Sequence, residues 1–257
     1  MKRTARRRAT VLIGAVLVAS FVGVGAARAD SEVWIDGTES MPPPPPSAIN
    51  ERLAKLHNAP PVIEVGNAAA VTTHIVWAMV AGDEEWQSFY GASWGSQAEL
   101  RMETADDQMY TQFGIDFRRF GGGWYGWTSS PNTSRPICGS GGLLEELKSD
   151  LPRISGADVV VGYTNNAMSG SSHGCASVNH TIVKLHGSST AQREYNVWTT
   201  SQHEFSHLYG APDRYPDPSN LHTNDVMEDH YNYPNIWCTQ AGYNDKGIVA
   251  SHASKYD

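Results

Sequence analysis

The sequence is poor in cysteine. It contains three, Cys138, Cys175 and Cys238, and no two of them stand in a CxxC spacing. A cysteine-based zinc ribbon needs such pairs, so this kind of metal site is excluded. In an oxidising compartment two of the three should form a disulfide, which leaves the third free or paired with another chain. The sequence does not determine the pairing; we favour Cys175–Cys238.

Basic residues are also scarce. The chain has 19 Lys and Arg against 27 Asp and Glu, a formal net charge of −8. Six of the basic residues and no acidic ones fall within residues 1–29, so a chain without that segment would carry −8 − 6 = −14. Such a charge excludes the basic surface of a nucleic-acid-binding protein and the polybasic face that binds anionic lipid. We expect a monomer that binds neither nucleic acid nor, after cleavage of that segment, a membrane.

The N-terminus lacks a hydrophobic run long enough for a membrane anchor. Its apolar stretch, Val11 to Ala26, is shorter than the roughly 20 apolar residues that span a bilayer. Basic residues precede the stretch, and Ala27-Arg28-Ala29 follows it as the small-x-small pattern that signal peptidase reads. Residues 1–29 are therefore predicted to be a signal peptide, and the protein to be secreted into the extracellular space. The Arg6-Arg7-Arg8 run leaves a twin-arginine export route open beside the general one.

Two further segments follow. Residues 30–66 resemble a leader: Pro42 to Pro46 favours an extended spacer, and Ser47 can cap a short helix that runs to Leu56. This leader is either a propeptide or an ordered N-terminal arm. Residues 67–257 are predicted to form one folded domain, and no repeat of fixed period indicates a solenoid or a propeller.

Strand and helix patterns alternate within that domain. The apolar and β-branched runs predict strands at 71–80, 115–120, 157–163, 175–178 and 181–185. Helices are predicted at 96–113, where Ser96 and Glu99 form a capping box, at 143–151 and at 192–209. The continuous apolar run at 157–163 suits a strand buried on both faces. The fold class is therefore α+β, with a mixed twisted sheet, a long helix late in the chain and an irregular C-terminal part.

The long helix contains the sequence His203-Glu204-Phe205-Ser206-His207. Histidines at positions i and i+4 lie one turn apart on one face, so both imidazoles can bind a single ion. Glu204 cannot easily join the same coordination sphere and can instead take a proton from a bound water. A pattern this short also occurs by chance on ordinary amphipathic helices, so the flanking residues decide its meaning.

The flanking residues favour a metal site. Gly210 stands three residues after His207, where the left-handed turn that ends a helix needs glycine. Asp213 follows three residues later, where the returning chain can offer a carboxylate as third ligand. Two nitrogens and one oxygen leave the fourth tetrahedral position open, as catalytic zinc requires. Glu228 is the alternative third ligand, but it would leave Gly210 and Asp213 unexplained.

The pattern HExxHxxGxxD resembles the zinc signature of the metzincin metalloproteases. The aspartate at its last position resembles the snapalysin-type secreted bacterial neutral proteases. The resemblance covers about residues 70–257 and implies that residues 67–257 form a metzincin-like zinc metalloprotease catalytic domain. Met227 would form the methionine turn beneath the metal, unless it is a simple core residue. No cysteine stands just before Met227, where snapalysin-like chains have one.

The same resemblance implies a substrate-binding edge strand. Gly174, Cys175, Ala176 and Ser177 would lie at the edge of the sheet, and the substrate would add to them as an antiparallel strand. The alternative is a plain edge strand. Tyr215 and Tyr231 are candidates for stabilising an oxyanion. The remaining histidines are expected to be structural or solvated: His74, His173, His180, His186, His222 and His230.

Together these features predict a zinc-dependent endopeptidase. His203, His207 and Asp213 would bind one catalytic Zn²⁺, and Glu204 would act as general base on a water and then deliver the proton to the leaving amine. The partner is a protein or peptide substrate, and no pattern indicates calcium. Two alternatives stay open: an exported zinc-binding protein, which would have no need of Glu204, and a hydrolase of non-peptide amides.

Overall fold

The computed structural model describes residues 72–130, 135–167, 172–214, 225–231 and 233–257. The predicted signal peptide, the leader with its polyproline run and short helix, Tyr215 and His222 lie outside these residues. Within these ranges, no helix is long and apolar enough to cross a membrane.

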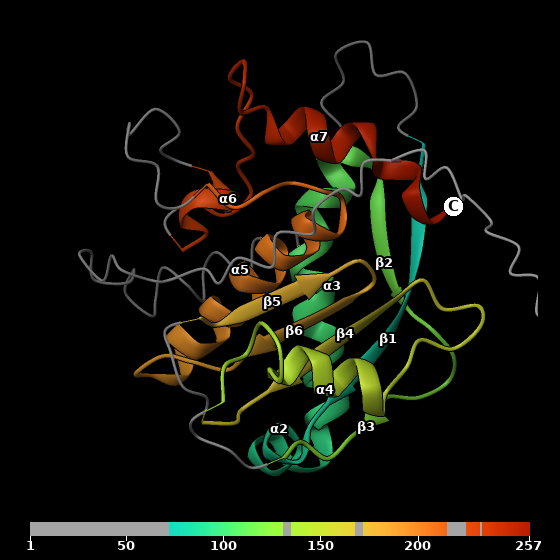
Figure 1. Ribbon diagram of the computed structural model, residues 1–257, viewed down its shortest axis with the longest axis vertical. Helices are drawn as coiled ribbons and strands as arrows, with labels where there is room; N and C mark the ends of the chain where they lie inside the picture. Colours follow the sequence, from blue (N-terminus) through green and yellow to red (C-terminus); the bar gives the residue numbers. More distant parts are fainter. Residues whose placement is uncertain (1–71, 131–134, 168–171, 215–224, 232) are drawn as a thin grey trace, which may run out of the picture.

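A mixed sheet of six strands forms the centre of the fold (Figure 1). In chain order the strands are β1 (His74–Gly82), β2 (Ile115–Arg119), β3 (Tyr125–Gly126), β4 (Val159–Thr164), β5 (Gly174–Ser177) and β6 (His180–Lys184). Their spatial order is β2-β1-β4-β6-β5. The short strand β3 lies outside this order and pairs with the last two residues of β1, Ala81 and Gly82. All pairs are parallel except β5–β6, which is antiparallel. Among the described strands β5 therefore ends the sheet, with one edge paired to β6.

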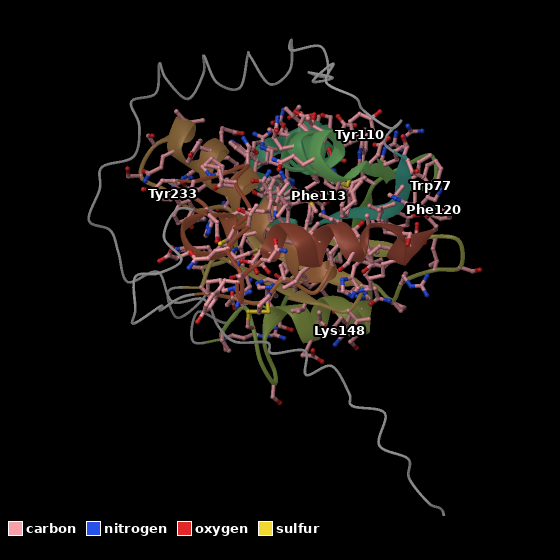
Figure 2. All side chains as sticks on the ribbon, turned by 90° about the horizontal axis from the view of Figure 1, so that it is seen from above. Trp77, Tyr110, Phe113, Phe120, Lys148 and Tyr233 are labelled. Carbon is pink, nitrogen blue, oxygen red and sulfur yellow. A yellow bond between two sulfur atoms is a disulfide. The ribbon has the colours of Figure 1, made fainter. Side chains whose placement is uncertain are left out.

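Helices cover both faces of this sheet. The helices are α2 (Glu84–Tyr90), α3 (Trp94–Phe113), α4 (Leu143–Asp150), α5 (Thr190–Leu208), α6 (Val226–Asp229) and α7 (Asp245–Ser251), with short 3-10 turns η1 (Gly91–Ser93) and η2 (Ala253–Tyr256). Helices α3 and α5 pack on one face and α4 on the other (Figure 1). Seen from above, Tyr110 of α3 and Lys148 of α4 lie on opposite sides of the molecule (Figure 2).

The alternation of side chains along each strand produces two apolar layers. On β1, Val76, Ala78 and Val80 join the large cluster under α3 and α5, whereas Met79 and Ala81 join the smaller cluster under α4. All six residues of β4 are buried, as predicted for a strand covered on both faces.

The predicted fold class is confirmed: the domain is α+β, with a mixed sheet, a long helix α5 and a C-terminal part of short helices. The predicted strands all form, with ends shifted by a few residues.

The prediction of a capping box at Ser96 and Glu99 was wrong. Helix α3 begins at Trp94 because η1 leads directly into it, so Ser96 lies inside the helix. The Ser96 hydroxyl donates to the Ser93 carbonyl (2.9 Å), and the Glu99 carboxylate accepts from Arg119 Nε (2.9 Å). Glu99 therefore links α3 to the end of β2 and does not cap the helix.

Helix α2 was not predicted. Its N-cap is Asp83, whose carboxylate accepts from the Trp86 N–H (2.8 Å), and Glu84 and Glu85 occupy its first turn. An N-cap aspartate followed by acidic residues is a recognisable helix start. The signal was present in the sequence, but the helix is too short to show a periodic apolar face.

Candidate active site

Helix α5 positions the central residues of the site. It starts at the N-cap Ser189, whose side chain accepts from the Gln192 N–H (3.2 Å), and it runs for 19 residues. Its second half is enclosed, since the sheet lies on one side and the C-terminal segment on the other. His203 is 1% exposed and Glu204 is 3% exposed. Side chains that leave this part of α5 therefore meet other protein groups and very little bulk solvent.

The turn after α5 holds one of the two histidines. Gly210 has a φ of +88°, its N–H donates to His207 O (2.9 Å), and the Ala211 N–H donates to Ser206 O (3.2 Å). This pair of bonds is the Schellman arrangement, in which glycine takes the left-handed position. The carbonyl oxygen of Ala211 then accepts from His207 Nδ1 (2.7 Å). The glycine turn was predicted from the sequence, and it also orients the ring of His207.

Both histidines are held with the same ring nitrogen toward the backbone. His203 Nδ1 lies 2.8 Å from the carbonyl oxygen of Val226. This contact is equivalent to the one between His207 Nδ1 and the carbonyl oxygen of Ala211. A carbonyl oxygen can only accept, so each Nδ1 carries the proton. In the neutral rings Nε2 then has its lone pair free to bind a metal, which is how ligating histidines are usually oriented.

The two Nε2 atoms and one carboxylate oxygen converge on a single point. His203 Nε2 lies 3.0 Å from Asp213 Oδ1, His207 Nε2 lies 3.1 Å from the same oxygen, and the two Nε2 atoms are 3.1 Å apart. Among the described residues, these three form a candidate metal-binding group, because the ligand atoms that they offer all lie within 4.8 Å of one another. Two imidazole nitrogens and a carboxylate oxygen suit zinc and leave one tetrahedral position open. The residues therefore fit a catalytic zinc ion.

The charges of the three side chains are mutually dependent. Burial by itself raises the pKa of Asp213, but the neighbouring His207 and His203 hold it well below its usual value. Burial lowers the pKa of His207, yet the charge of Asp213 outweighs this effect and raises it to about 9. The carboxylate of Asp213 thus stabilises a positive charge at the two histidines, whether a proton or a metal cation carries it.

Glu204 lies beside this group with one carboxylate oxygen unused. Its Oε2 is buried and has no hydrogen-bond partner among the described residues. Burial raises the pKa of Glu204 to about 7, although the charges of His207 and His203 act in the opposite direction. A buried carboxylate oxygen without a partner is unusual, and groups with such raised pKa values are frequent at catalytic sites.

Met227 and Glu228 lie next to the site on the short helix α6. The N-cap of α6 is Asp225, whose carboxylate accepts from the N–H groups of Met227 (2.7 Å) and Glu228 (3.1 Å). Met227 is fully buried in the large apolar cluster, and the neighbouring Val226 supplies the carbonyl that holds His203. The structure brings Asp213, and not Glu228, together with the two histidines.

The favoured disulfide pairing was wrong. The structure joins Cys138 to Cys175, with Cα atoms 5.5 Å apart, and leaves Cys238 free and partly buried. Strand alternation turns Cys175 toward the α4 side of the sheet, where Cys138 lies in the same apolar cluster. Cys238 follows Trp237, which packs in the cluster on the opposite face of the sheet.

A second group of histidines lies near the site and was not foreseen as a cluster. The rings of His173 and His186 stack with centroids 3.6 Å apart, and His186 Nε2 lies 2.6 Å from the hydroxyl oxygen of Tyr231. His186 Nδ1 lies 2.9 Å from Lys184 O and therefore carries the proton, so the Tyr231 hydroxyl donates to Nε2. His230 packs beside His203, with ring centroids 5.1 Å apart.

Burial disfavours the charged form of these three histidines. Burial lowers the pKa of His186 to about 4 and that of His173 to about 2, and it lowers the pKa of His230 well below its ordinary value. Burial of this kind is compatible with the structural role expected for these three, which stays a prediction. Their sequence positions are scattered, so no local spacing could have revealed that they meet.

Comparison with known proteins gives structural likenesses only. No family model matches the sequence, and no curated protein matches it. Among solved structures, an archaemetzincin from Methanopyrus kandleri matches with 15% identity over 74% of this chain and 99% of that chain, with a TM-score of 0.46. A zinc-dependent peptidase from Methanocorpusculum labreanum matches with 10% identity over 69% and 100% of the two chains, with a TM-score of 0.38.

A third solved structure is a chaperone–substrate complex. It matches with 14% identity over 72% of this chain, with a TM-score of 0.47, and this chain spans about a third (34%) of the length of the chain that it matches. All three TM-scores lie below 0.5, and the chemistry of the site is inferred from its own residues.

Proposed function

We propose that this chain is a secreted, metzincin-like zinc endopeptidase of the type with an aspartate as third ligand. One observation carries the proposal: His203 Nε2, His207 Nε2 and Asp213 Oδ1 converge beside the buried carboxylate of Glu204. His203, His207 and Asp213 would hold the zinc ion. When bound there, zinc lowers the pKa of a coordinated water and polarises the carbonyl of the peptide bond to be cleaved.

The residues of the chain have distinct roles in this proposal. Glu204 accepts the proton of the attacking water and passes it to the leaving amine, as a general base that becomes a general acid. Burial acts to raise its pKa, which helps the carboxylate to hold the proton between the two steps. The carbonyls of Val226 and Ala211 keep the two rings in the tautomer that presents Nε2. Asp213 supplies the negative charge that holds a cation between them.

The substrate is proposed to bind along β5. This strand is the edge of the sheet next to α5, and Gly174 at its start lies against Glu204. An extended peptide can add to such an edge through its main chain, largely independently of its sequence. That mode of binding favours peptides and proteins over small amides as substrates.

Secretion is part of the proposal. The sequence of residues 1–29 supports it, and so does the Cys138–Cys175 disulfide, since disulfides persist in oxidising compartments.

Three variants test the function. Glu204→Gln should bind one zinc ion per chain, as the wild type does, and should lose between about 10²- and 10⁴-fold in kcat on casein, because only the base is removed. Asp213→Ala should lose zinc affinity, whereas Glu228→Ala should keep it. Zinc is measured by elemental analysis, and acetylated sugars serve as the alternative substrates for a hydrolase of non-peptide amides. Casein cleavage that survives exhaustive removal of zinc would refute the proposal.

A further inference from the structure

Gly174 occupies a position where a side chain has no room. Its φ lies outside the left-handed region, so the backbone conformation does not require glycine. An ideal Cβ atom at this position would lie 2.7 Å from Glu204 Cγ and 2.7 Å from Thr200 Cγ2, and nearer still to Glu204 Oε1. Carbon atoms in contact normally stay about 3.5–4.0 Å apart. Glycine is therefore needed here for space.

Two of the three atoms nearest to this space belong to Glu204, the proposed general base, and the third belongs to Thr200. Strand alternation directs Cys175 toward the α4 side of the sheet, so position 174 faces α5. Thr200 and Glu204 are one helical turn apart on the face of α5 that meets this strand. The carboxylate of Glu204 thus lies against the bare backbone of β5, next to the histidines on its other side.

The strand cannot easily move away from Glu204. Gly174 pairs with Val183 of β6, and the neighbouring His173 carbonyl accepts from the Lys184 N–H (2.8 Å). The Cys138–Cys175 disulfide fastens the next residue to the segment before α4, and Cys138 Sγ lies 3.2 Å from the Gly174 carbonyl oxygen. Since a disulfide sulfur carries no proton, the contact between Cys138 Sγ and the Gly174 carbonyl oxygen is close packing and not a hydrogen bond. A methyl group at position 174 would therefore displace the Glu204 side chain and not the strand.

We infer that Gly174 is a positioning residue: its missing side chain, on a strand fastened by the Cys138–Cys175 disulfide, sets the place of the Glu204 carboxylate. The catalytic consequence rests on the proposed function, whereas the packing does not. Gly174→Ala shifts the base away from its working position and leaves the three zinc ligands unchanged.

The first experiment separates zinc binding from catalysis. Gly174→Ala should bind one zinc ion with an affinity within about threefold of wild type, and its kcat on a casein-derived peptide should fall at least about 100-fold, the lower range for loss of a general base. KM should change less than about threefold. The matched control is Gly122→Ala, at an exposed glycine with nothing within 4 Å of an added Cβ, and it should keep wild-type kcat. A kcat for Gly174→Ala above a tenth of wild type would overturn the inference.

The second experiment is a double-mutant cycle on thermal stability, which requires no activity. In the wild-type background Gly174→Ala should lower the melting temperature by roughly 5 °C or more, as expected for overpacking in a domain of this size. In the Glu204→Ala background the clash with Glu204 is gone, so the loss should be at least halved, with Thr200 accounting for the remainder. Equal losses in both backgrounds would overturn the inference.

The cycle also covers a variant that fails to fold. If Gly174→Ala alone does not fold, the double variant with Glu204→Ala should fold, and its failure would count against the inference. If the wild-type protein cleaves no peptide, the proposed function fails, while the cycle still decides whether Gly174 positions Glu204.

Discussion

Asp245 of α7 is fully buried and forms an ion pair with Arg214, the residue directly after the third proposed zinc ligand. Arg214 Nη2 lies 2.7 Å from Asp245 Oδ1, and Arg214 Nε lies 3.1 and 3.2 Å from the two carboxylate oxygens. The Arg214 N–H donates to Met227 O (3.2 Å), and its guanidinium lies 5.1 Å from the centre of the Tyr243 ring. Arg214 therefore ties the segment that carries Asp213 to both α6 and α7.

Asp245→Ala should destabilise the protein strongly. Removing one partner of a buried ion pair leaves the other charge unpaired and costs about 3–5 kcal/mol. The side chain of Arg214 is 14% exposed and that of Asp245 is 0% exposed, so solvent can compensate little. A loss of this size is a substantial part of the roughly 5–15 kcal/mol that stabilises a typical domain. Loosening of the Asp213 segment should also weaken zinc binding by about 10- to 100-fold, as is typical when groups that orient ligands are removed.

Two assays test this prediction. Urea unfolding in the presence of a chelator gives the free energy of unfolding of the metal-free protein, and competition with a chromophoric chelator gives the zinc affinity. Asp245→Asn keeps an oxygen acceptor for Arg214 and should lose less in both assays. Asp116→Ala, which breaks the half-exposed pair with Arg118, should change stability by at most about 1 kcal/mol. The reasoning would be refuted if the Asp245→Ala protein had a free energy of unfolding within about 1 kcal/mol of wild type and a zinc affinity within about threefold of wild type.

Three further predictions concern other parts of the chain. Burial raises the pKa of Asp83 to about 7, so between about pH 4 and 7 the native state keeps a proton that the unfolded state has lost, and the free energy of unfolding falls as pH rises. In urea unfolding at pH 4.5 and 7, the free energy of unfolding of Asp83→Asn should fall less with pH than that of the wild type. An equal fall in the two proteins would contradict this prediction. Gly210→Ala should cost about 1–2 kcal/mol in the same assay, because φ is +88° there, and no loss would argue against the turn. Thiol titration of the denatured, unreduced chain should find one reactive thiol, which Cys238→Ser abolishes; three would contradict the Cys138–Cys175 disulfide.

Features that depend on neighbours in sequence were predictable. The apolar run at 157–163 required a strand covered on both faces, and β4 is buried at every position. The spacing from His207 through Gly210 to Asp213 predicted a glycine turn that returns a carboxylate to the histidines, and the structure brings these side chains together. In both cases a few bonds within one short segment determine the geometry.

Features that depend on which face of the sheet a residue occupies were not predictable to the same degree. The disulfide partner of Cys175 follows from the direction in which its strand turns it, toward the cluster under α4. A shift of one residue in the β5–β6 register would reverse that direction and would also turn Gly174 away from α5. The spacing of cysteines along the chain contains no information about this register.

The same dependence explains why the histidine–glutamate motif describes the site only in part. Residues 203–213 can supply the ligands and the base, but His203 takes its orientation from the Val226 carbonyl, 23 residues away, and Glu204 takes its position from Gly174 on β5. Neither contact involves the side chain of the supporting residue: one uses a backbone oxygen, and the other uses the absence of a side chain. Sequence patterns are read from side chains, so support of this kind leaves almost no trace in them. A chain with the same motif but a bulkier residue at the start of β5 would keep the three zinc ligands and lose the space that the base occupies.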